Sequence, residues 1–128
     1  MTVAGYVLAG IAALLHVFIF YLESVAWESA RARKVFGTSI EEAQTTKFLA
    51  FNQGFYNLFL AVIVVIGIVS AACGEKTIGA TLVLAGVGSM LAAAFVLFVA
   101  SAPHRPAAIR QGAFPLLALV VLTIGLSI

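Results

Sequence analysis

The stretch Asn52-Gln53-Gly54-Phe55-Tyr56-Asn57 carries four hydrogen-bonding side chains inside a segment that is otherwise apolar enough to cross a bilayer. A polar group in hydrocarbon is costly unless it finds a hydrogen-bonding partner. These side chains are therefore expected to face other polar groups, and the other apolar segments of the chain offer His16, Glu23 and Gln111. The sequence predicts that these groups share one cluster.

The composition is typical of a membrane protein. Hydrophobic residues make up 63% of the 128 and charged residues only 9%, whereas soluble domains carry about 25% charged residues. At this length we expect a single integral-membrane domain over residues 1–128. The single Cys73 excludes an intramolecular disulfide. The few basic residues sit beside apolar segments, where they indicate membrane topology and not nucleic-acid binding.

Four apolar segments predict an all-α membrane protein, a bundle of four transmembrane helices. Their expected bounds are about 3–27, 46–72, 77–101 and 107–128, and about 20 apolar residues suffice to span hydrocarbon. A short, basic amphipathic segment that ends at Gly37 is expected on the cytoplasmic surface between the first two helices. Ser39 and Glu42 fit a capping box, so the second helix begins before it enters the membrane.

The third and fourth segments are expected to differ in role. The third contains no ionisable residue and reads as scaffold, with small residues expected at close helix contacts: Ala85, Gly88, Ser89, Ala92 and Ala93. The fourth contains Pro115 within its helix, because a helix that began there would span only roughly 21 Å. We expect Pro115 to kink this helix and to free the carbonyl of Gln111.

Basic residues set the expected orientation. Six Lys or Arg residues lie at the first-to-second and third-to-fourth connections, and only Lys76 lies at the opposite side. The positive-inside rule then makes both basic loops cytoplasmic and places both termini outside a plasma (inner) membrane. A cleaved signal peptide is not expected, because no Lys or Arg precedes the first apolar run, which contains His16 and Glu23.

The predicted heights of the polar residues support a shared cluster. On an α-helix His16 and Glu23 are seven residues apart, so their directions differ by only about 20°. At about 1.5 Å per residue, both lie in the cytoplasmic half of the membrane, at heights that Asn57 and Gln111 also reach. Three helices therefore predict one polar pocket there.

These positions define a candidate site. Glu23 and His16 are the candidate acid–base pair, since a carboxylate inside a membrane helix is a functional candidate by default. The candidate ligand-binding residues are Asn52, Gln53, Tyr56, Asn57, Gln111 and Trp27. Structural explanations stay open as well: Glu23 could reach the interface or pair with Arg31 or Arg110, and the amides could only hold helices together.

Metal and cofactor signals are weak. His16 and Glu23 alone form a thin ligand set, and the chain has no HxxxH or CxxC spacing, so no metal site is expected. No phosphate-binding glycine loop or nucleophile motif is present, and the sequence indicates no particular cofactor.

The chain resembles a small bacterial integral-membrane family known as domain of unknown function 1304. The resemblance rests on His16, Glu23 and Trp27, on Lys34-Val35-Phe36-Gly37, on Asn52-Gln53-Gly54 with Tyr56-Asn57, and on Gln111 with Pro115. It covers nearly the whole chain. It implies four transmembrane helices and no assigned activity.

Three functions stay open. The first is binding, or acid–base conversion, of a small hydrophobic or lipid-like molecule taken from the bilayer. The second is proton-coupled transport of a small molecule by a homo-oligomer, since four helices rarely enclose a pathway alone. The third is an accessory subunit of a larger membrane complex. A pocket open to one side favours binding, a cavity that reaches both faces favours transport, and a dry, fully paired cluster favours the accessory role.

Overall fold

The computed structural model describes all 128 residues, and it is all-helical, as predicted. Four helical segments are long and apolar enough to cross a membrane. The first joins α1 (Thr2–Phe20) to a π-helical turn, η1 (Tyr21–Val25), and the second is α3 (Ile40–Ala72). The third is α4 (Lys76–Ala100), and the fourth joins the 3₁₀ turn η2 (Ala102–His104) to α5 (Arg105–Ser127). A short helix, α2 (Ala30–Phe36), connects η1 to α3.

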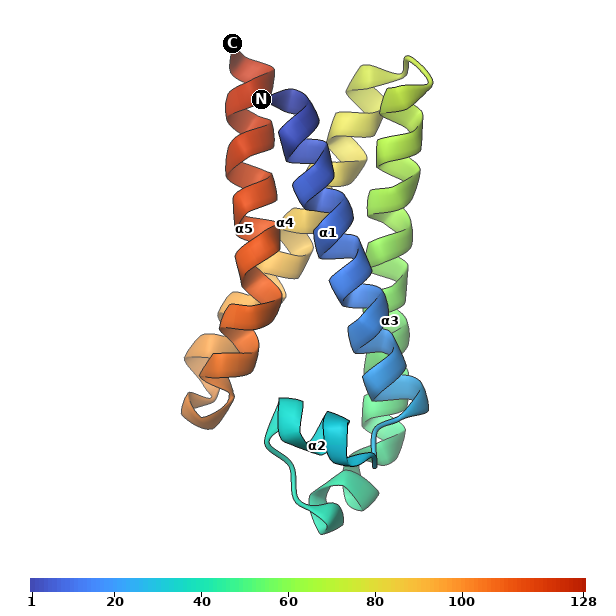
Figure 1. The fold of residues 1–128 in the computed structure, drawn as a ribbon, viewed down its shortest axis with the longest axis vertical. Helices are drawn as coiled ribbons and strands as arrows, with labels where there is room; N and C mark the ends of the chain where they lie inside the picture. Colours follow the sequence, from blue (N-terminus) through green and yellow to red (C-terminus); the bar gives the residue numbers. More distant parts are fainter.

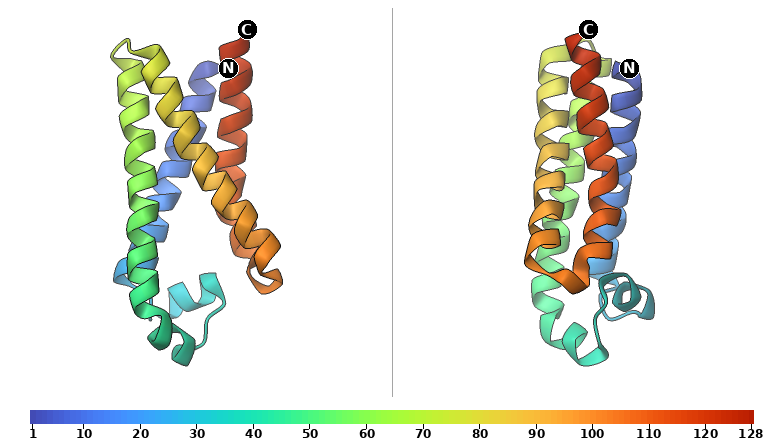
Figure 2. Two further views of the ribbon diagram at one scale, coloured as in Figure 1. Left: turned by 180° about the vertical axis from the view of Figure 1, so that it is seen from behind. Right: turned by 90° about the vertical axis from the view of Figure 1, so that its left-hand side faces the viewer.

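The four long helices form a ring that opens toward one end. α1 packs between α3 and α5, and α4 packs between the same two neighbours on the other side. Both termini lie at one end, which we call the terminal end (Figure 1). Toward the opposite end the α1–α3 pair diverges from the α4–α5 pair, and α2 lies across that end, which we call the α2 end (Figure 1, Figure 2).

Small residues bring the helices close together. The core contains three alanines of α1 and larger side chains of the other helices, all at most 2% exposed: Ala9, Ala12, Ala13, Val64, Val83, Val87, Met90 and Leu122. A Cβ atom at Gly79 would lie only 2.6 Å from the Ala71 side chain, so α3 and α4 can approach this closely only with glycine there. The middle of the bundle is therefore packed and apolar.

The prediction of which α4 residues form close helix contacts is wrong. Ala85, Ser89, Ala92 and Ala93 are exposed and Gly88 is only partly buried, whereas Gly79 and Gly86 face the neighbouring helix. The predicted residues repeat at three- and four-residue spacings, and so do the buried residues Gly79, Val83, Gly86, Met90 and Ala94. A helix that is apolar all round does not reveal which of two such stripes faces its neighbours.

The helix ends predicted from neighbouring residues agree well with the structure. Ser39 and Glu42 form the predicted capping box, with bonds of 2.9 and 3.1 Å between each side chain and the other residue's backbone N–H. Gly37 ends α2 in the left-handed conformation, with φ 68°. The first long helix ends at Val25, before the predicted Trp27, because the chain leaves it through η1. α5 stays helical through the buried Pro115 and bends along its length (Figure 1).

Candidate functional site

The π turn η1 sets the position of Glu23. The Ala26 N–H donates to the Tyr21 carbonyl at 3.0 Å, five residues back instead of four. Such single π turns in α-helices occur frequently at functional sites. Because the turn is wider than an α-turn, the seven-residue relation between His16 and Glu23 that holds on a regular α-helix does not extend through it.

η1 packs directly on α3 at Gly54. The Ser24 hydroxyl donates to the Phe51 carbonyl at 2.7 Å. A Cβ atom at Gly54 would collide with that hydroxyl and lie 3.1 Å from the Cβ of Glu23. The glycine inside the opening stretch therefore lets the backbone of η1 approach α3 and brings Glu23 against it.

Glu23 and Asn57 meet across this contact. The Asn57 side-chain amide donates to Glu23 Oε2 at 2.7 Å, and Glu23 is only 9% exposed. Oε1 of Glu23 has no hydrogen-bonding partner in the chain, and Glu23 forms no ion pair with Arg31 or Arg110. The structure thus joins one acidic and one amide side chain from two different helices and leaves one carboxyl oxygen free.

His16 lies apart from this pair. Its ring is 2% exposed, and its Nδ1 donates to the Ala12 carbonyl one turn earlier at 2.8 Å. Nε2 has no partner in the chain. His16 precedes Glu23 by seven residues, roughly 10 Å along the helix axis. The acid–base pairing of His16 with Glu23 stays a prediction.

Three residues of the opening stretch are exposed and form no hydrogen bond with Glu23. Asn52, Gln53 and Tyr56 are exposed on the outside of α3, and none of their side chains forms a hydrogen bond within the chain. The inward face of α3 is taken instead by Gly54 and Asn57. The ligand-binding role of the three exposed residues stays a prediction.

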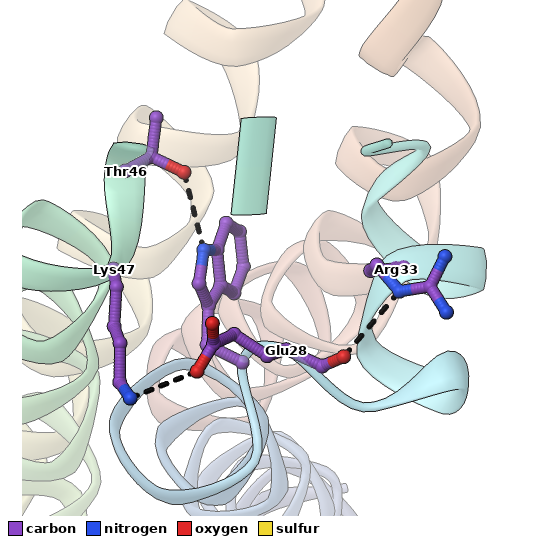
Figure 3. Close-up of polar contacts among 5 residues, drawn as sticks. Glu28, Arg33, Thr46 and Lys47 are labelled. Carbon is purple, nitrogen blue, oxygen red and sulfur yellow. Dashed lines mark hydrogen bonds and ion pairs between the residues drawn. The ribbon is translucent and has the colours of Figure 1, made fainter. Parts of the chain in front are cut away.

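The turn after η1 is tied to α3 and α2 by polar contacts. Trp27 Nε1 donates to the Thr46 hydroxyl at 3.1 Å, and the Trp27 ring packs against Phe36 with 5.2 Å between centroids. Glu28 pairs with Lys47 at 2.8 Å, and its carbonyl accepts from Arg33 Nε at 3.3 Å (Figure 3). Sequence reasoning did not assign Glu28 or Lys47 to the site, because it treated Lys47 only as a topology signal and did not consider Glu28.

These contacts surround a pocket of about 150 Å³, which we call the Glu23 pocket. Glu23 lines it together with residues 24–29, and α3 contributes Lys47 and Phe51. The predicted residues Glu23 and Trp27 thus share one cavity, whereas His16 and Asn57 do not line it. No group of three metal-ligating side chains comes together anywhere in the chain.

Gln111 belongs to a different cavity. A pocket of about 140 Å³, which we call the α5 pocket, lies between α1, η1, α2 and α5. Its lining includes Leu22, Phe36, Arg110 and Gln111. The neighbours Leu22 and Glu23 therefore line separate pockets on the two sides of η1, and the structure does not bring Gln111 to Glu23.

Comparison with known proteins identifies a family whose description gives no function. The sequence model of one family matches residues 10–123, a range that contains every candidate residue from His16 to Gln111. No curated protein and no solved structure matches the chain. The chain belongs, as its motifs predicted, to the family described as "Protein of unknown function (DUF1304)".

Proposed function

We propose that this protein lies in a membrane and binds the cationic head group of a small amphiphile in the Glu23 pocket. The observation that supports this most is the carboxyl group of Glu23: it is 9% exposed, is held by Asn57 through one oxygen, and lines a pocket with its other oxygen unpartnered in the chain. A buried carboxylate is costly unless it is paired. A ligand that donates hydrogen bonds and carries positive charge would supply the missing partner.

The surroundings of Glu23 favour a cation. The pocket is built around the C-terminal end of the first long helix, where the last carbonyls have no intrahelical donors and carry partial negative charge. Trp27 and Phe51 add aromatic rings, whose faces attract ammonium groups. The one cation in the lining, Lys47, is already paired with Glu28.

The position of the pocket favours an amphiphile. Six of the seven basic residues lie in or beside the connections at the α2 end, so we propose that this end is cytoplasmic and that both termini lie outside. The Glu23 pocket then lies near the boundary between water and hydrocarbon. A molecule with a charged head can reach the pocket there while its tail stays in the bilayer.

Binding is better supported than the alternative functions. Transport would need a homo-oligomer to form the path, because the middle of a single chain is filled by apolar side chains such as Ala12, Val64 and Val87, each at most 2% exposed. Proton transfer between His16 and Glu23 would need both groups at one ligand, and only Glu23 lines the pocket. An accessory role predicts a dry, fully paired cluster, and Glu23 Oε1 is unpaired.

The test is a calorimetric titration of the detergent-solubilised protein with hexylammonium chloride and, separately, with hexanol. We expect the wild type to bind hexylammonium more tightly than hexanol. Glu23→Gln should weaken hexylammonium binding about tenfold or more, the size of one hydrogen bond to a charged group. Glu75→Gln removes the same charge at the terminal end and should leave binding unchanged. Equal binding of hexylammonium to wild type and Glu23→Gln would refute the proposal.

A further inference from the structure

The α5 pocket combines an apolar lining with one unpaired cation. Seven of its nine lining side chains are hydrophobic, and they come from α1, η1, α2 and α5. The two polar members are Arg110, which is exposed, and Gln111. The pocket lies toward the α2 end, where the α1–α3 and α4–α5 pairs diverge and α2 crosses the opening (Figure 2).

Arg110 has no partner within the chain. The one ion pair of the structure joins Lys47 to Glu28, and Arg110 makes no side-chain hydrogen bond. Arg110 nevertheless belongs to a helical segment apolar enough to span a membrane, Ala102–Ser127. Charged side chains in such segments are rare and almost always face a partner or a polar cavity.

Arg105, on the same helix, shows the contrast. Its Nε donates to the Phe98 carbonyl at 3.1 Å, and its guanidinium lies 5.0 Å from the centroid of the Phe98 ring. Arg105 does not line the α5 pocket. Arg105 thus finds its partners within the chain. Arg110, at an apolar cavity, is left to pair with a group from outside the chain.

We propose that the α5 pocket holds part of one acyl chain of an anionic phospholipid, whose phosphate pairs with Arg110. The apolar lining suits a hydrocarbon chain, and the unpaired guanidinium suits a phosphate, which it can bind through two parallel hydrogen bonds. Gln111 adds a side-chain donor beside it. Exposed Arg31 and Lys34 of α2 add positive charge at the same end. This site is separate from the Glu23 pocket and shares with the proposed function only the placement of the chain in a membrane.

The only tryptophan of the chain can report on this pocket. Trp27 packs against Phe36, and Phe36 lines the α5 pocket. Bromine atoms on a lipid chain quench indole fluorescence over short distances. A brominated chain inside the α5 pocket would therefore quench Trp27 from behind Phe36.

The experiment measures Trp27 fluorescence of the full chain in phosphatidylcholine vesicles that contain a fixed fraction of brominated lipid. The brominated lipid is phosphatidylglycerol in one set and phosphatidylcholine in the other. We expect the wild type to prefer the anionic lipid roughly two- to fivefold, the range of a partly exposed ion pair. Arg110→Gln should abolish that preference, whereas Arg105→Gln, which removes the same charge outside the pocket, should keep it.

A second variant separates the pocket from general charge attraction and from misfolding. Ala107 lines the α5 pocket and is 8% exposed, so Ala107→Phe places a ring in the cavity without changing charge. Circular dichroism checks the helix content of the Ala107→Phe protein. Quenching of its Trp27 by brominated phosphatidylglycerol should fall to the level given by brominated phosphatidylcholine. Equal quenching by the two lipids in the wild type, an equal loss in Arg105→Gln, or full preference in a folded Ala107→Phe would each overturn the proposal.

Discussion

Replacing Gly54 by alanine tests the contact that brings Glu23 to α3. The added methyl group would collide with the Ser24 hydroxyl and lie 3.1 Å from Glu23 Cβ, so η1 must move or Ser24 must give up its bond to the Phe51 carbonyl. Overpacking of this kind costs about 1–3 kcal/mol, and a lost hydrogen bond costs about 1 kcal/mol more. Alanine's higher helix propensity returns about 1 kcal/mol. The net expectation is a loss of roughly 1–3 kcal/mol.

Gly88→Ala is the matched control. A Cβ atom there meets only Leu119 Cδ1, at 3.9 Å, which is ordinary contact. This variant should be unchanged or more stable by up to about 1 kcal/mol. Unfolding in detergent is followed by circular dichroism for global helix content and by Trp27 fluorescence, since Trp27 lies in the turn that follows η1. Equal stability of the Gly54 and Gly88 variants would refute the close approach of η1 to α3.

Two further predictions concern topology and the Glu23–Asn57 bond. In intact cells a membrane-impermeant maleimide should label Cys73, which is exposed in the connection between α3 and α4, and that connection lies at the terminal end (Figure 1). In a Cys73→Ser background the reagent should label Ser39→Cys only after permeabilisation, and the reverse pattern would invert the orientation. Asn57→Leu should destabilise the protein by about 1–3 kcal/mol because it leaves a buried carboxyl group without its donor, whereas Asn52→Leu, on the exposed face of α3, should cost little or nothing in thermal unfolding.

The parts of the fold that depend on local signals were predictable. Apolar segments long enough to span predicted the four long helices, and the Ser39–Glu42 capping box and Gly37 marked helix ends that the structure confirms. These features depend on residues close together in the sequence. Their geometry can therefore be read from short stretches of sequence.

The rotation of each helix about its own axis was harder to predict from the sequence. α3 is apolar on nearly all sides, so the polar residues of its opening stretch could not show which of them face α1; Gly54 was the usable cue, because a glycine at that point permits close approach. The π turn could not be read from the sequence either, since it is accompanied by contacts of Ser24 with Phe51 and Gly54, far along the chain. The expected height of Gln111 along its helix is near the α2 end, where the structure has it. The sequence did not show that Gln111 lines the α5 pocket and not the Glu23 pocket.

The central claim is that Glu23 serves a ligand and does more than hold η1 to α3. The direct measurement is thermal unfolding in detergent of wild type, Glu23→Gln and Glu75→Gln, each with and without hexylammonium chloride. A ligand that binds only the folded state raises the apparent melting temperature, and the rise grows with the logarithm of ligand concentration over Kd. We predict that Glu23→Gln, which can still accept a hydrogen bond from Asn57, keeps nearly the wild-type melting temperature without ligand and loses the increment that ligand produces in the other two proteins. A lower melting temperature without ligand, together with an intact increment, would show that Glu23 only joins helices and would contradict the account.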